Sequence, residues 1–351
     1  METNISNMIA GETNNTKAKE CLKETAGKMG WRYAVFAVAV IAVQLLVSGV
    51  LSVVAPQWIE ENMSLFQLLL IIFSVDIIGF PLIFILSKKV PAAKLEKHNI
   101  GFGKLIVCVF IGAGICGAGM IIGNILHFGL TLPFGADMGD VNQLGNLMLS
   151  SDAFIRILTV GILAPIFEEL IFRKLLIDRI VNHGEFAAIL MSGLMFGLFH
   201  GNFSQFFFAT GLGMFWAFIY IKTGKIRYTI LFHMIVNLSS SVISVYLSQM
   251  YLEALSAAGP EMTEITGEGM MAMALYLGWM GFLMVCCIVG VILFIVNKSE
   301  FHLNTDYMEM SKKEMAGSAL SSKGMILYYI PCIVLFLMAY APTIINFFMN
   351  K

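Results

Sequence analysis

Apolar segments about 20 residues long, the length that a helix needs to cross a ~30 Å hydrocarbon core, constrain this chain more than any other feature. They occur at about 33–55, 64–86, 105–132, 153–173, 227–248, 273–296 and 326–348. A further apolar block at 186–221 is too long for one span and is interrupted at His200-Gly201-Asn202, which predicts a helical hairpin. The pattern therefore predicts about nine transmembrane helices.

Composition excludes a water-soluble fold. Hydrophobic residues make up 58% of the 351 residues and charged residues 13%, whereas soluble domains carry about 25% charged residues. We therefore predict an all-α, polytopic transmembrane bundle whose surroundings are the lipid bilayer. No basic patch suited to a nucleic acid stands out, so no nucleic-acid partner is expected.

The charges between the apolar segments predict the orientation of the chain. Of the 22 Lys and Arg residues, 20 lie in 1–32, 87–104, 173–185, 222–227 and 298–324, and the intervening loops are acidic. Because positive loops stay in the cytoplasm, we expect a multi-pass protein of the cell membrane with a cytoplasmic N-terminus. The chain then divides into a polar tail (1–32), N-terminal helices (33–152), a central helical part (153–248) and C-terminal helices (249–351).

Ionisable side chains inside apolar spans are costly and usually mark function. Two neighbouring glutamates, Glu168 and Glu169, follow a long apolar run in the fourth span. They lie ~100° apart on a helix, so they cannot point the same way. Glu169 is four residues before Arg173 and can pair with it, which leaves Glu168 free to point elsewhere. The alternative is that these residues form the solvated cytoplasmic end of a helix.

Two further polar pairs follow, each with a spacing of four residues that places both members on one helix face. Phe196 and His200 end the first half of the hairpin, and His233 and Asn237 lie on the seventh helix. Taken singly, His200 can be an interfacial residue, and His233 and Asn237 can be interhelical hydrogen-bonding residues. Asp76, in an earlier span, belongs to no motif.

Together, Glu-Glu-x-x-x-Arg, Phe-x-x-x-His and His-x-x-x-Asn fall on neighbouring helices in this order. The segment 153–248 therefore resembles the CPBP family of intramembrane proteases, which includes type II CAAX prenyl endopeptidases and bacterial Abi-type bacteriocin-immunity proteins. The resemblance implies a four-helix catalytic core and a glutamic endopeptidase. By resemblance, Glu168 and His200 activate a water, and His233 and Asn237 form the oxyanion hole. Glu169, Arg173 and Phe196 would surround these residues and fix their orientation.

The sequence alone does not decide whether the side chains of Glu168 and His200 lie close together. Counted from 153 at the outer surface, Glu168 lies ~22 Å deep, whereas the hairpin tip that carries His200 lies nearer the outer side. A tilt, a kink at Pro165 or a re-entrant hairpin would have to bring the two side chains together.

No cofactor is expected, because a carboxylate and a water can hydrolyse a peptide without a metal. Zinc stays an alternative, with Glu168, His200 and His233 as its ligands, although no His-Glu-x-x-His motif is present. A hydrophobic or membrane-associated peptide is the expected substrate, and nothing in the sequence indicates a prenyl group. Two other functions stay open: a non-catalytic immunity or peptide-binding protein of the same fold, and a transporter, for which no internal symmetry is visible.

Overall fold

A computed structural model describes residues 2–134, 143–257, 267–304 and 310–349 of the chain. Within these ranges all the regular elements are helices, which confirms the predicted all-α class. The first half contains α1 (Glu2–Val54), α2 (Pro56–Glu61), α3 (Met63–Ile71), a π-helical segment (Ile72–Gly79), α4 (Phe80–Ser87), α5 (Phe102–Thr131), a 3-10 turn (Leu132–Phe134) and α6 (Gln143–Ser150).

The central part starts with one uninterrupted helical run that contains two π-helical segments. This run consists of α7 (Ala153–Arg156), a π-helical segment (Ile157–Leu163), α8 (Ala164–Glu169), a second π-helical segment (Leu170–Leu175) and α9 (Leu176–Ile180). It is followed by a 3-10 turn (Val181–His183), α10 (Glu185–Phe199), α11 (Phe203–Thr223), α12 (Ile226–Asn237), a π-helical segment (Leu238–Ile243) and α13 (Ser244–Ala257). The C-terminal part contains α14 (Gly267–Val296), a 3-10 turn (Lys298–Glu300), α15 (Lys312–Leu320) and α16 (Lys323–Met349).

Seven helices in the described ranges are long and apolar enough to cross a membrane. They cover Asn14–Val54, Met63–Ser87, Phe102–Phe134, Phe203–Thr223, Ile226–Ala257, Gly267–Val296 and Lys323–Met349. The two other expected spans are also helical, but α10 is only 15 residues long and the run that contains 153–173 carries charged residues along its length. The polytopic bundle is confirmed, and the count of nine spans stays a prediction.

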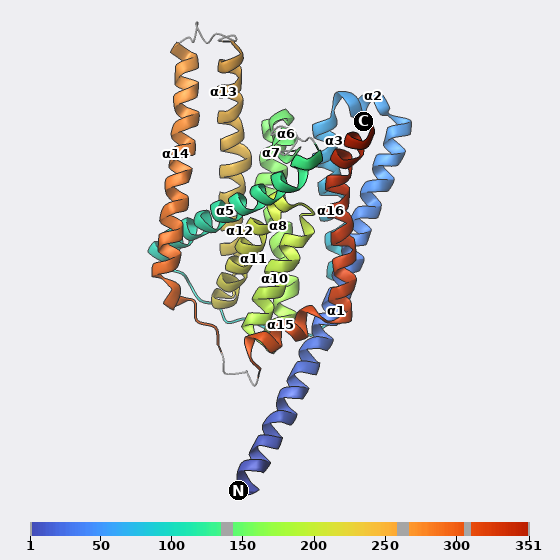
Figure 1. The fold of residues 1–351 in the computed structure, drawn as a ribbon, viewed down its shortest axis with the longest axis vertical. Coiled ribbons are helices and arrows are strands. Elements are labelled where there is room, and N and C mark those ends of the chain that lie inside the picture. The colour runs from blue at the N-terminus through green and yellow to red at the C-terminus, as the bar shows by residue number, and fades with distance from the viewer. Residues whose placement is uncertain (1, 135–142, 258–266, 305–309, 350–351) are drawn as a thin grey trace.

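The helices of the central part lie in the middle of the molecule (Figure 1). There α10 packs against α11, α5 crosses over α11, and α14 packs against α5 and α13. On the other side α1 packs against α16, and α15 lies across the base of this pair. The central helices are thus surrounded by apolar helices from both ends of the chain.

The interruption predicted inside the long apolar block is confirmed as a tight turn between α10 and α11. Gly201 has a φ of +67°, a left-handed conformation that L side chains rarely adopt. Asn202 then caps α11, because its side-chain oxygen accepts the backbone N–H of Gln205 at 2.9 Å. The turn fixes His200 at the C-terminal end of α10.

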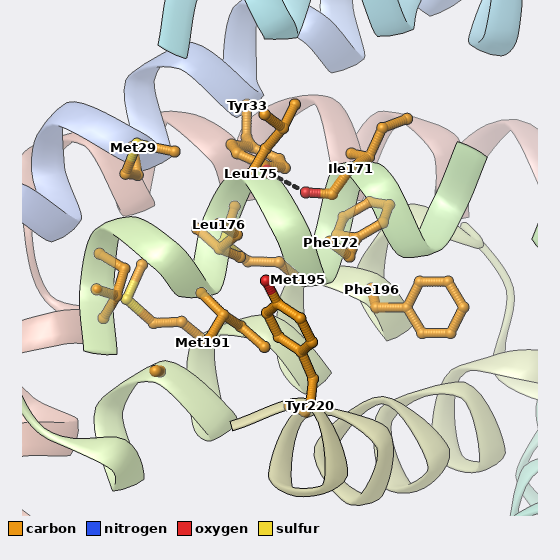
Figure 2. Packing of buried hydrophobic residues seen from close by; sticks show 14 of the residues in the cluster. Met29, Tyr33, Ile171, Phe172, Leu175, Leu176, Met191, Met195, Phe196 and Tyr220 are labelled. Atoms are coloured by element: carbon orange, nitrogen blue, oxygen red, sulfur yellow. Dashed lines mark hydrogen bonds between the residues drawn. The ribbon is translucent and has the colours of Figure 1, made fainter. Parts of the chain in front are cut away.

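The main core joins α1 to the central helices (Figure 2). Tyr33 of α1 is completely buried, and its hydroxyl donates to the backbone carbonyl of Ile171 at 2.5 Å. The neighbouring π-helical segment contributes Phe172, which contacts the ring of Phe196 from α10 at 5.3 Å between centroids. These contacts fix the run 153–180 and α10 against α1, and with them the residues that the sequence analysis selects.

Helix α15 is tied to α1 outside the apolar part of the chain. Lys19 lies 2.6 Å from the carboxylate of Glu314, and Glu314 also completes a capping box with Ser311 at the start of α15. The hydrogen bond from Lys19 and those from Ser311 lower the pKa of Glu314 from 4.5 to about 2.

Candidate active site

Three elements meet around the glutamate pair. The run 153–180 carries Glu168 and Glu169 at the end of α8, α12 packs against α8, and α10 packs against the π-helical segment that follows. Pro165 lies in the first turn of α8, directly after the π-helical segment Ile157–Leu163. This change of register sets the direction in which the two glutamates leave the helix.

The pairing expected from the spacing is present. The Glu169 Oε1 atom lies 3.0 Å from Nη2 of Arg173, and both side chains are 0% exposed. The guanidinium carbon of Arg173 also lies 4.5 Å from the ring centroid of Phe196 and 5.6 Å from that of Trp216. A buried charge needs such partners, because its desolvation is otherwise uncompensated. Glu169 and Arg173 therefore form a dry ion pair between aromatic rings.

The neighbouring Glu168 points away from this pair. Its side chain is 22% exposed, and its Oε2 atom lies 3.6 Å from Nε2 of His233. The difference in exposure agrees with the predicted ~100° angle between adjacent helical side chains. Glu168 is thus the carboxylate of this pair that a water or a substrate can reach.

His233 lies between the two glutamates. Its Nδ1 is 3.1 Å from Oε1 of Glu169, and its ring stacks on Trp216 at 4.6 Å between centroids. A carboxylate that is paired with an arginine can only accept a hydrogen bond, so Nδ1 carries the proton. The neutral ring then presents Nε2 as an acceptor towards Glu168.

His200 is not in direct contact with Glu168. No ion pair within 4.0 Å joins these two residues in the described part of the chain, and the Nδ1–H of His200 donates to the Phe196 carbonyl at 2.8 Å. The Phe196 ring contacts both imidazoles. Its centroid lies 4.8 Å from that of His200 and 5.8 Å from that of His233. The prediction that Glu168 and His200 share a water stays a prediction.

Asn237 makes an interhelical hydrogen bond, which is the alternative that the sequence analysis left open. Its Nδ2 donates to the backbone carbonyl of Val160 at 2.9 Å. The amide has a second N–H, so this bond does not by itself remove Asn237 from an oxyanion hole.

Two residues at the site were not found by the motif analysis. Trp216 of α11 stacks on His233, and a single tryptophan within an apolar helix gives no sequence signal for this. Asp76 lies buried in the π-helical segment Ile72–Gly79, which packs against α8, the turn that carries Glu168. Its position inside an apolar span was the available signal, but its partner could not be read from the sequence.

The donor atoms as arranged do not form a metal centre. No group of three His, Cys, Asp or Glu side chains in the described ranges is placed to hold a metal ion. His233 already uses Nδ1 towards Glu169, and a zinc site would require three ligand atoms at ~2 Å from one point. The expectation that the chemistry needs no cofactor stays a prediction.

Known proteins are similar to this chain in the part that contains the site. The family described as "Type II CAAX prenyl endopeptidase Rce1-like" matches residues 150–239, a segment that contains all seven motif residues. The Bacillus subtilis (strain 168) protein named "Putative membrane peptidase YdiL" is 27% identical over 159 residues. That alignment covers 45% of this chain and 63% of the relative, which is less than two thirds of its length. No solved structure matches the chain.

Proposed function

Because residues 150–239 match the type II CAAX prenyl endopeptidase family, we propose that this chain is a glutamic intramembrane endopeptidase of the CPBP family whose general base is Glu168. The proposal rests above all on one observation. Of two adjacent glutamates, one is sealed in an ion pair, and the other is partly exposed with Oε2 3.6 Å from the Nε2 of His233. The buried ion pair fixes the helix, and the partly exposed carboxylate of Glu168 is free to take part in the reaction.

The proposed reaction begins with a water held between Glu168 and His200. Since the Nδ1–H of His200 is used on the Phe196 carbonyl, the neutral ring offers Nε2 as an acceptor for one water hydrogen. Glu168 takes the other hydrogen as the water oxygen attacks the scissile carbonyl carbon. The C–N bond then breaks, and the proton held by Glu168 passes to the leaving nitrogen. The products are a carboxylic acid, which keeps the second water hydrogen until it ionises, and an amine.

The negative charge on the carbonyl oxygen has two candidate donors. The sequence analysis assigns this role to His233 and Asn237, and side-chain N–H groups of this kind are typical of oxyanion holes. In the tautomer fixed by Glu169, His233 donates from Nε2 only after its ring has taken up a proton. The second N–H of Asn237 is the donor that needs no such step.

The proposed substrate is a hydrophobic or membrane-associated peptide. The helices around the site are apolar and long enough to cross a membrane, so a substrate reaches Glu168 either from the lipid or from a cavity within the bundle. The matched family is named for prenylated substrates, and for this chain we propose the peptide alone.

Replacement of Glu168 by Gln tests this function against the alternative of a peptide-binding or immunity protein. Membrane peptides from cells that produce the wild-type or the Glu168→Gln protein would be compared by mass spectrometry. We expect cleavage products that depend on the carboxylate, and unchanged thermal unfolding of the purified variant in detergent. A peptide profile or an immunity phenotype that is the same for both proteins would support the binding function instead.

A further inference from the structure

The backbone carbonyl of Val160, beside the site, lacks its helical hydrogen-bond donor, and the sequence explains why. The segment Ile157–Leu163 is π-helical, a form in which an N–H bonds to the carbonyl five residues before it, and at its end the N–H of Ala164 donates in this way to Thr159. The next bond in this register would join the N–H of residue 165 to the carbonyl of Val160. Residue 165 is proline, which has no N–H.

The side chain of Asn237 supplies the missing donor. Its Nδ2 lies 2.9 Å from the Val160 oxygen, although the two residues are 77 positions apart in the chain. The helices approach closely here because of Gly161, where a Cβ would lie 2.7 Å from Cδ2 of Leu238, the residue after Asn237. In an apolar surrounding an unpaired carbonyl is costly, and neighbouring polar side chains are the usual remedy at a proline.

This bond and the contact of His233 hold the same short turn from one helix. The turn α8 starts one residue before Pro165 and ends with the two glutamates. Asn237 binds the carbonyl that precedes the turn, and His233, one helical turn earlier on α12, binds Glu169 at its end. The position of Glu168 is therefore defined at both ends of α8 by side chains of α12.

We propose that Asn237 is a positioning residue, which acts through the Val160 carbonyl to hold the turn that carries Glu168. Its activity readout rests on the proposed peptidase function, whereas its stability readout does not. This role is separate from that of the second Asn237 N–H, which stays available for the oxyanion, and any donor that reaches Val160 can take it over.

The sequence offers such a donor, because Pro165→Ala restores the backbone N–H at the position that lacks it. The four proteins to compare are wild type, Asn237→Ala, Pro165→Ala and the double variant, each measured for thermal unfolding in detergent and for the cleavage products that it forms in cells. We expect Asn237→Ala to unfold several degrees lower and to lose products. The double variant should unfold like Pro165→Ala, since two residues that share one partner give non-additive effects.

Pro342→Ala in the Asn237→Ala background is the matched control. Pro342 also lies inside a helix, α16, but away from Val160, so this substitution should restore neither stability nor products. Should Asn237→Ala fail to fold, the double variant decides, because the proposal requires it to fold like Pro165→Ala.

One result of the unfolding measurements overturns the proposal. If Asn237→Ala lowers the unfolding temperature equally in the wild-type and in the Pro165→Ala background, the bond to Val160 does not stabilise the protein. Restored stability without restored products supports the Val160 bond and assigns the remaining loss of products to the oxyanion role of the second Asn237 N–H. If even the wild-type protein forms no products that depend on Glu168, the peptidase function fails, and the unfolding temperatures still decide the role of the bond.

Discussion

Two adjacent residues with the same side chain, Glu168 and Glu169, have opposite surroundings in this protein. Glu169 neutralises the fully buried Arg173, so Glu169→Gln leaves a guanidinium without its counter-charge. Loss of one member of a buried ion pair costs about 3–5 kcal/mol. We expect this variant to unfold at a much lower temperature in detergent than Glu168→Gln, whose side chain is partly exposed. Equal unfolding temperatures would show that the buried pair does not stabilise the fold.

His200 gives the test of the shared water. If Glu168 and His200 hold one water, His200→Ala should lose cleavage products as completely as Glu168→Ala, and the double variant should be no worse than either. Product formation would be measured by mass spectrometry of membrane peptides. Activity of His200→Ala within about tenfold of wild type, or ~1.4 kcal/mol of barrier, would contradict the assignment.

Metal dependence is also decided by single side chains. Since Nδ1 of His233 faces Glu169 and three ligands do not converge in the described ranges, we expect the purified protein to stay active after treatment with a strong chelator. Elemental analysis should find well under one zinc per chain. Zinc bound in stoichiometric amount, whose removal stops activity and whose return restores it, would make Glu168, His200 and His233 ligands.

Among the elements, the hairpin of α10 and α11 is the most sensitive to added volume. At Gly193 a Cβ would lie 2.8 Å from both the backbone nitrogen of Met214 and the carbonyl oxygen of Thr210. Since backbone atoms cannot move aside, Gly193→Ala should separate the helices and lower the unfolding temperature. Gly278→Ala is the control, because nothing lies within 4 Å of its added Cβ, and it should be neutral or stabilising. Similar effects of both would rule out tight packing as the reason.

The elements also show how far the sequence could be interpreted. Apolar length predicted the helices and the break at 200–202, and the spacing of four predicted the pairing of Glu169 with Arg173. The contact of His233 with Glu169 could not be predicted, because it depends on how closely two helices pack that are 64 residues apart. The π-helical register before Pro165 was also missed, since hydrophobic patterns do not specify which carbonyl each N–H selects. A kink at Pro165 was one of three alternatives for bringing Glu168 and His200 together, and its consequence for Val160 was not foreseen.

At the scale of the whole molecule, the number of spans and their orientation are predictions from apolar length and charge, and experiment can test them. Nine spans with a cytoplasmic N-terminus place the C-terminus outside and the basic segment 298–324 inside. A reporter fused after Lys351 should therefore be active outside the cell, and one inserted within 298–324 should be active in the cytoplasm. The same side for both reporters would break the nine-span prediction.

Ion pairs of two kinds in this molecule differ in what dissolved salt can do to them. Mobile ions screen exposed charges over about 8 Å at physiological ionic strength, but they do not enter a dry interior. The pair of Lys19 and Glu314 lies at the surface, so the attachment of α15 to α1 weakens as salt is added. The pair of Glu169 and Arg173 is 0% exposed and keeps its strength. The turn that carries Glu168 is thus held independently of ionic strength, while the base of the bundle responds to it.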